Sequence, residues 1–206
     1  MALLDRMALE PQNLTAIDDL PTGVERHLAD SLAGLVVAAV RSATTLVDIG
    51  SGGGFPGLPL AIVRPDLTVT LLDSEGRKAD WLARASAPFP NVRVVSARSE
   101  ELAVTEREGF SCATARALGP LPVVLELAAP LVAVGGSVIV WRAGRDAADE
   151  SAAAEAARLL GLEPEGVVGV TPFAGAQRHL HSFRKVDATP ARFPRRPGRA
   201  AKRPLA

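Results

Sequence analysis

The sequence predicts an α/β protein with a doubly wound, mostly parallel seven-stranded sheet, an antiparallel edge strand and a basic C-terminal tail. Three observations support this fold class. Short apolar runs alternate with helical segments, a glycine cluster follows the first run, and residues 178–206 are strongly basic. Strands that alternate with helices pair in parallel through right-handed crossovers. The chain of 206 residues, 48% hydrophobic and 22% charged, suffices for one such domain.

The elements follow one another in a regular order. The first 24 residues are polar and rich in turn formers, so we expect an irregular lead-in before a helix over 25–41. Pro65 and Pro88 end the next two helices, and Gly135 and Gly136 separate a later helix from the fifth strand. The expected strands cover 44–49, 67–73, 92–96, 110–115 and 137–141, and the expected helices between and after them cover 58–63, 76–87, 120–132 and 147–160.

The C-terminal third differs from this alternation. Two weaker strand signals at 167–171 and 180–186 have no helix between them, so they predict an antiparallel hairpin at the sheet edge. We therefore expect three parts: a lead-in over 1–24, a folded domain over 25–188, and a basic tail over 189–206.

The net charge of zero hides an uneven distribution. Residues 1–177 carry a net charge of −8, whereas residues 178–206 carry +8. A basic segment on an acidic body indicates an anionic partner, with nucleic acid as the first candidate, although a solvated terminus has the same composition. Residues 190–205 hold four prolines and six Lys or Arg, so we expect no core there, only an arm that orders on binding or a flexible tail.

Other features exclude several classes of protein. The single cysteine, Cys112, excludes an internal disulfide framework and a multi-cysteine metal cluster, and its apolar neighbours predict a core position. Trp81 and Trp141 are also expected to pack in the core or at its edge. The N-terminus lacks a secretory layout and the longest apolar stretch is half a membrane span, so we expect a cytosolic protein that contacts no membrane.

The segment 47–57, Val-Asp-Ile-Gly-Ser-Gly-Gly-Gly-Phe-Pro-Gly, follows the first strand at the sheet edge where open α/β folds bind ligands. Two motifs fit it. The dinucleotide spacing uses Gly52, Gly54 and Gly57, whereas the adenosylmethionine spacing uses an acid and three glycines: Asp48, Gly50, Gly52 and Gly54. The second register places Asp48 beside the ammonium group of the cofactor. Either way, the loop predicts a nucleoside-type cofactor.

Asp73 ends the second strand, 25 residues after Asp48. A carboxylate at this position accepts hydrogen bonds from both ribose hydroxyls of either cofactor. It is equally suited to cap the following helix, as Ser74 is.

Several segments together resemble the bacterial small-subunit ribosomal RNA guanine-N7 methyltransferases, also called glucose-inhibited division protein B. The resemblance runs from Asn13 to Leu205, and its most specific part is the glycine loop that continues into Phe-Pro-Gly-x-Pro-Leu-Ala-Ile, with His-x-x-Asp-Ser upstream. The matching segments are 13–17, 26–32, 48–62, 71–74, 97–100, 115–117, 193–198 and 202–205.

This resemblance implies a class I, Rossmann-like enzyme that transfers a methyl group from S-adenosylmethionine to N7 of a specific guanine in 16S rRNA. It implies a cytoplasmic monomer without a metal ion that acts on the small ribosomal subunit. The implied cofactor contacts are Asp48, Gly50, Ser51, Gly52, Gly54, Phe55, Asp73, Ser74, Ser99, Glu100 and Arg116. The implied substrate-positioning residues are His27, Asp30, Ser31 and Arg116. Arg142 is a further candidate, because it follows a strand end at the ligand edge, where a guanidinium can bind phosphate or the O6 edge of guanine.

The chemistry agrees with a site that lacks an obvious general base. Guanine N7 already carries an in-plane lone pair, so alignment of the reacting atoms supplies most of the rate. The basic tail would neutralise rRNA phosphates through Arg192, Arg195, Arg196, Arg199, Lys202 and Arg203. His179 and His181 share a strand face, but no third ligand is nearby, so we expect no metal site.

The sequence departs from the family pattern at three places. The N-terminal region is shorter than usual, Arg142 and Ala143 replace Lys-Gly, and Ser111 stands where an aspartate is common. Three alternatives stay open: a methyltransferase of the same fold for a small molecule or protein, a nicotinamide-dependent reductase, and a non-catalytic rRNA-binding assembly factor.

Overall fold

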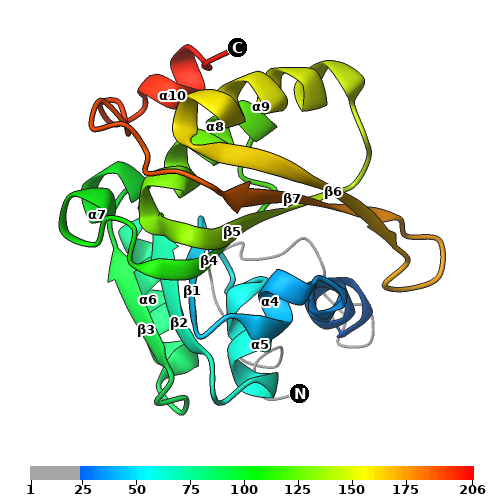
Figure 1. Ribbon diagram of the computed structural model, residues 1–206. Helices are drawn as coiled ribbons and strands as arrows, with labels where there is room; N and C mark the ends of the chain where they lie inside the picture. The colour runs from blue at the N-terminus through cyan, green and yellow to red at the C-terminus, as the bar shows by residue number, and fades with distance from the viewer. Residues whose placement is uncertain (1–23) are drawn as a thin grey trace.

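The computed structural model describes residues 24–206 (Figure 1). They contain one seven-stranded sheet in the order β3-β2-β1-β4-β5-β7-β6. Strands β1 to β5 pair in parallel, and β7 is antiparallel to both β5 and β6. The predicted doubly wound sheet with an antiparallel hairpin at one edge is confirmed. The strands are β1 Thr45–Ile49, β2 Thr68–Asp73, β3 Val92–Ser96, β4 Phe110–Arg116, β5 Val132–Arg142, β6 Leu162–Val170 and β7 Arg178–Lys185.

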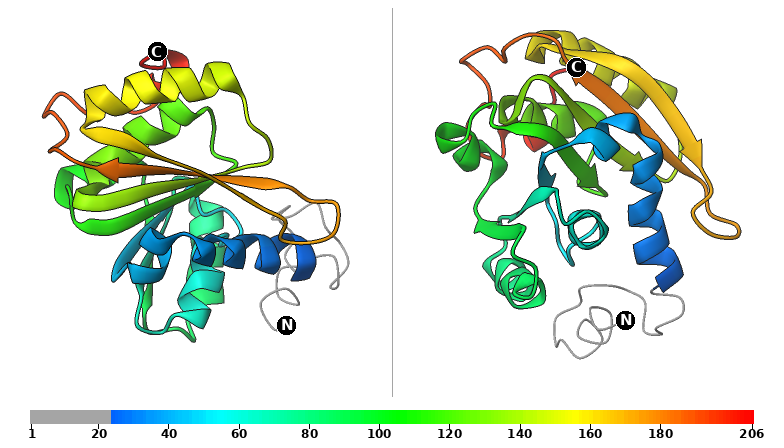
Figure 2. Two further views of the ribbon diagram at one scale, coloured as in Figure 1. Left: turned by 45° about the vertical axis from the view of Figure 1, so that its right-hand side comes forward. Right: turned by 60° about the horizontal axis from the view of Figure 1, so that its bottom comes forward.

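Helices cover both faces of the sheet (Figure 2). Alternate residues of each central strand point to opposite faces and into two apolar clusters, so that Leu71 packs in one cluster and Leu72 in the other. Cys112, Trp81 and Trp141 are all buried, as predicted. The helices are η1 Val24–Ala29, α3 Asp30–Leu32, η2 Ala33–Val36, α4 Ala38–Ser42, α5 Gly57–Val63, α6 Gly76–Ser86, α7 Ser99–Thr105, α8 Leu121–Ala128, η3 Ala129–Leu131, α9 Ala147–Leu160 and α10 Arg199–Lys202.

Several predicted boundaries were wrong. The single helix expected over 25–41 is divided into η1, α3, η2 and α4, with extended backbone at Val37, because glycine and consecutive β-branched residues weaken a helix there. No local pattern indicated α7. Strand β5 begins before Gly135, and β6 begins directly after α9, passing through Pro164 on the exposed edge where proline is tolerated. The lead-in expected over 1–24 lies, except for Val24, outside the described residues.

The C-terminal tail requires the largest correction. Phe193 and Ala200 are each 4% exposed, and Leu205 packs against the same apolar cluster as α8 and α9. The Nε atom of Arg195 donates to Oε1 of Glu126 on α8 at 2.7 Å. The expectation that this segment builds no core was wrong, because its few apolar side chains and its arginine find partners on the domain. From β7 the chain returns over the domain and ends in α10 beside α8 (Figure 1).

Within residues 24–206, no helix combines the length and apolar character needed to span a bilayer.

Candidate functional site

The loop between β1 and α5 holds all three glycines of the adenosylmethionine spacing at positive φ. Gly50, Gly52 and Gly54 have positive φ angles of 69°, 55° and 100°. These are the three glycines of that register, whereas Gly57, the last glycine of the dinucleotide spacing, opens helix α5. A Cβ atom on Gly52 would meet no atom closer than 3.9 Å. The loop backbone at Gly52 therefore borders open space, where a ligand can approach closely.

Asp48 stabilises this loop through two hydrogen bonds of its side chain. Its Oδ2 accepts from the backbone N–H of Gly57 at 3.0 Å, and its Oδ1 accepts from the Thr114 hydroxyl at 2.8 Å. The side chain is fully buried, and this burial raises the pKa of Asp48 to about 6 despite the hydrogen bonds. Asp48 does not line the cavity at the carboxyl edge of the sheet, although the sequence motif predicts it beside the cofactor. It stabilises the start of α5.

A cavity of about 380 Å³ opens at the carboxyl ends of β1, β2, β3 and β4. The predicted residues Gly50, Gly52, Asp73, Ser74, Ser99 and Glu100 line it. The predicted residues Asp48, Ser51, Gly54, Phe55 and Arg116 do not. Gly198, Ala200 and Ala201 of the C-terminal segment complete one wall, which no sequence pattern indicated.

Asp73 presents two acceptor atoms at the end of β2. Its Oδ2 accepts from the backbone N–H of Gly52 and its Oδ1 from that of Glu75, each at 2.9 Å. The second bond forms a turn just before α6, whose N-cap residue is Glu75 and which has no side-chain cap, so the capping role considered for Asp73 and Ser74 is not found. Ser99, the first residue of α7, donates its hydroxyl to the Leu127 carbonyl at 2.6 Å.

A second group of side chains surrounds Phe55, which follows the glycine loop. The His27 ring stacks on Phe55 with centroids 4.6 Å apart, and the Arg116 guanidinium carbon lies 5.2 Å from the Phe55 ring centre. Arg116 Nη1 donates to Asp30 Oδ2 at 3.1 Å, and Arg178 Nε lies 3.2 Å from Asp30 Oδ1. The structure therefore brings the upstream His-x-x-Asp-Ser element to the end of β4.

His27 is neutral in this cluster at ordinary pH. Burial, followed by the positive charge of Arg116, lowers the pKa of His27 to about 4. Ser31 is fully buried and donates its hydroxyl to the His27 carbonyl at 2.6 Å, so it stabilises the helix and does not face the ligand. The sequence does not single out Arg178, because nothing in its local pattern shows that β7 starts beside the end of β5.

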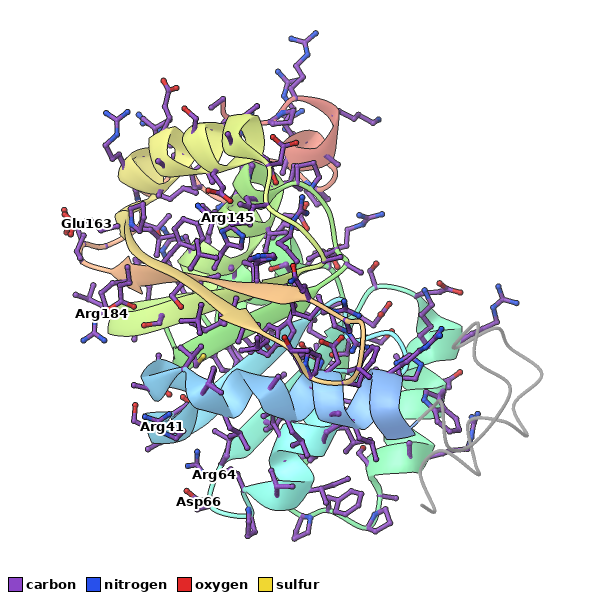
Figure 3. All side chains as sticks on the ribbon, turned by 90° about the vertical axis from the view of Figure 1, so that its right-hand side faces the viewer. Arg41, Arg64, Asp66, Arg145, Glu163 and Arg184 are labelled. Atoms are coloured by element: carbon purple, nitrogen blue, oxygen red, sulfur yellow. The ribbon has the colours of Figure 1, made fainter. Side chains whose placement is uncertain are left out.

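Arginine side chains line a second cavity of about 580 Å³ beside the first. Ala117 lines both cavities, so they adjoin at the turn after β4. Figure 3 places Arg145 on the connection between β5 and α9, far from the Arg64–Asp66 pair near the start of β2. The cavity arginines are Arg116, Arg142, Arg145 and Arg178, and acidic side chains partly balance their charge.

Two predicted positions are tied into the fold. Arg142 donates to the Gly119 carbonyl at 2.8 Å and to Asp149 Oδ2 at 2.9 Å, so it positions the turn as well as lining the cavity. Ser111 links β4 to the start of β1 by accepting from the backbone N–H of Thr45 at 3.1 Å, at the opposite end of the sheet. The departure at Ser111 therefore does not touch the site.

The tail cations divide into two kinds. Arg195, predicted to contact RNA, pairs with the buried Glu126, so its charge is already compensated within the fold. The other predicted RNA contacts are exposed: Arg192, Arg196, Arg199, Lys202 and Arg203. Among residues 24–206, no three His, Cys, Asp or Glu side chains gather as a metal-binding group.

Comparison with known proteins adds independent information. Residues 6–181 match the model of the GidB family, described as rRNA small subunit methyltransferase G. The chain is 38% identical over 201 residues to Ribosomal RNA small subunit methyltransferase G of Caldanaerobacter subterraneus subsp. tengcongensis, covering 95% of this chain and 84% of that protein. It is 41% identical over 203 residues to the protein of that name from Chloroflexus aggregans, covering 94% of this chain and 82% of that protein.

Solved structures share the fold at low identity. A 16S rRNA (adenine(1408)-N(1))-methyltransferase from Catenulisporales acidiphilia, in a mutant form, aligns with a TM-score of 0.61 and 18% identity over 78% of this chain and 92% of that chain. A Burkholderia thailandensis 1,6-didemethyltoxoflavin-N1-methyltransferase with S-adenosylhomocysteine aligns with a TM-score of 0.59 and 20% identity over 79% of this chain and 80% of that chain. These similarities establish the class I methyltransferase fold.

Proposed function

Because the chain belongs to the rRNA small subunit methyltransferase G family of S-adenosylmethionine-dependent enzymes, we propose that it methylates N7 of one guanine in 16S rRNA. The observation that carries this proposal is the contact between two cavities at Ala117: one suited to a nucleoside cofactor and one lined by arginines. Family membership argues against a reductase or a small-molecule methyltransferase.

The first cavity fits S-adenosylmethionine. Its volume lies in the usual range for small-molecule sites. Asp73 would accept from the ribose hydroxyls, and the backbone around Gly50 and Gly52 would lie against the amino-acid part. Ser99 and Glu100 would flank the adenine through their backbone. When bound, this cofactor supplies an electrophilic methyl group.

The second cavity fits a guanine nucleotide in RNA. Guanidinium groups bind phosphates in pairs of hydrogen bonds and also bind the O6 and N7 edge of guanine. Arg116 and Arg178 are held by the carboxylate of Asp30, which is 3% exposed, so their directions are set before the substrate arrives. This fixed geometry would align the base with the cofactor.

No side chain is required to remove a proton. N7 attacks with its own lone pair, and the neutral His27 ring packs on Phe55 to shape the cluster. His27 and Asp30 are therefore positioning residues, and Ser31 supports them through the helix backbone. The base must leave its RNA stack to enter the site, as is usual for enzymes that act on base atoms.

The exposed cations of the C-terminal segment would hold the RNA backbone. Arg192, Arg196, Arg199, Lys202 and Arg203 remain in this role, and Arg195 does not. Such phosphate contacts make binding weaken as salt concentration rises. The proposal includes a monomeric enzyme that acts on the small ribosomal subunit in the cytoplasm.

The test is transfer of labelled methyl from S-adenosylmethionine to small ribosomal subunits from a strain that lacks this enzyme, followed by digestion to nucleosides. We expect label in 7-methylguanosine. Arg178→Met should reduce transfer at least about tenfold, because the loss of one charge-assisted contact is worth ~1.5–3 kcal/mol. Arg184→Met, at the other end of β7, is the matched control and should transfer normally. Label in another nucleoside, in ribosomal protein or nowhere would contradict the proposal.

A further inference from the structure

The C-terminal segment, residues 190–206, meets the cofactor cavity at three small residues. Gly198, Ala200 and Ala201 line the same cavity as the glycine loop and Asp73. The backbone N–H of Gly198 donates to Oε1 of Glu100 at 2.9 Å. A segment whose composition suggested an RNA arm thus forms part of the wall beside the residue expected to flank adenine.

The start of this segment is anchored to the turn between α7 and β4. The Lys185 ammonium, which is 1% exposed, lies 3.0 Å from Oε1 of Glu108 and donates to the Thr189 hydroxyl at 2.6 Å. Arg107 donates to the carbonyls of Thr189 at 2.5 Å and Phe193 at 2.9 Å. These bonds fix the position at which the chain leaves the domain.

The middle of the segment is anchored to α8. Glu126 is 1% exposed, and the Arg195 guanidinium is the cation that compensates its charge. The ring of Phe193 is buried in the apolar cluster next to this pair. Since α7 and α8 also contribute Ser99 and Val123 to the cavity, the anchors and the wall belong to one packed unit.

We propose that residues 190–206 are a structural part of the cofactor site, which closes the adenine end of the cavity and sets the affinity for the adenosyl group through Gly198, Ala200 and Ala201. This inference rests on the proposed function, because it takes the cavity to hold S-adenosylmethionine. The small side chains at these three positions leave the space that the nucleoside occupies. The segment therefore contributes to cofactor binding in addition to any contact with RNA.

The experiment compares two identical substitutions within the segment. Ala201→Leu adds a large side chain to the cavity wall at an exposed helical position, where leucine is well tolerated. Ala191→Leu adds the same side chain at an exposed position that does not line the cavity. Binding of S-adenosylhomocysteine and of adenosine is measured by calorimetry, and thermal unfolding checks that both variants fold.

We expect Ala201→Leu to raise Kd for both ligands at least about tenfold, and Ala191→Leu to leave both within about twofold of the wild type. Unchanged Kd in a folded Ala201→Leu variant, with a wild type that binds, would overturn the inference alone. A wild-type protein that does not bind S-adenosylhomocysteine would instead overturn the proposed function and the inference with it.

Discussion

Replacing Asp48 by asparagine distinguishes a structural role of this residue from direct contact with the cofactor. The carboxylate is fully buried between the N–H of Gly57 and the hydroxyl of Thr114. An asparagine side chain retains both interactions, because its oxygen accepts from Gly57 and its NH₂ group donates to the Thr114 oxygen. Asp48→Asn therefore removes a buried negative charge and keeps the geometry of the loop.

The size of the effect follows from the pKa of Asp48. Burial raises this pKa from 3.8 to about 6. Between pH 3.8 and about pH 6, the Asp48 carboxyl keeps its proton in the folded protein and loses it in the unfolded chain. The stabilisation is therefore fully present below the unfolded pKa and is lost as pH rises through the folded pKa. A difference of about two pKa units corresponds to ~3 kcal/mol.

Urea unfolding of the wild type and Asp48→Asn at several pH values measures this difference. Between about pH 4 and pH 7 the variant should gain ~2 kcal/mol in free energy of unfolding relative to the wild type. Its affinity for S-adenosylhomocysteine should stay within about threefold of the wild-type value, less than the loss of one charged contact would cause. If the free energy of unfolding of both proteins depended on pH in the same way, the buried-charge argument would be refuted. A large loss of S-adenosylhomocysteine affinity in Asp48→Asn would show that Asp48 contacts the cofactor directly.

Three further predictions concern the loop, the tail and the histidine. Gly50→Val combines a positive φ with a Cβ only 2.6 Å from Leu118 Cδ1, so calorimetry should show at least about tenfold weaker S-adenosylhomocysteine binding; unchanged affinity would exclude this loop. Arg195→Met leaves the Glu126 carboxylate unpaired and should destabilise the fold by ~3 kcal/mol in urea unfolding. Adding Glu126→Gln to this variant should recover most of the lost free energy of unfolding. An Arg195→Met variant as stable as the wild type would show that the Arg195–Glu126 pair does not stabilise the fold. Because burial lowers the pKa of His27 to about 4, the rate of methyl transfer should not change with the protonation of a histidine near pH 6.5. A change in rate near pH 6.5 that is absent in His27→Gln would contradict a neutral His27 ring.

The order of strands and helices could be predicted because each element carries its own local pattern. Buried parallel strands appear as short apolar runs, and proline or glycine separates them from helices. The glycine loop and Asp73 could be assigned because their position at strand ends follows from the alternation itself. Helix α7 could not, since two of its four buried residues, Ser99 and Glu100, are polar, so no apolar helical period is visible there.

Contacts between distant segments could not be predicted. The partner of Arg195 is a glutamate 69 positions away, and composition alone made the segment look solvated. Arg178 joins Asp30 only because β7 runs antiparallel beside β5, which no local pattern shows. Likewise, a motif suggests that Asp48 is near the cofactor, but the direction of its side chain depends on Thr114 and the packing of α5.

The most direct test of the central claim is to map the methylated base in small ribosomal subunits treated with this enzyme and S-adenosylmethionine. N7-methylguanine permits chemical cleavage of the RNA chain at the modified nucleotide. Two cavities that adjoin at Ala117 and hold one flipped base predict cleavage at a single guanine of the 16S rRNA. Methyl incorporation without such cleavage, or cleavage at many guanines, would contradict the account.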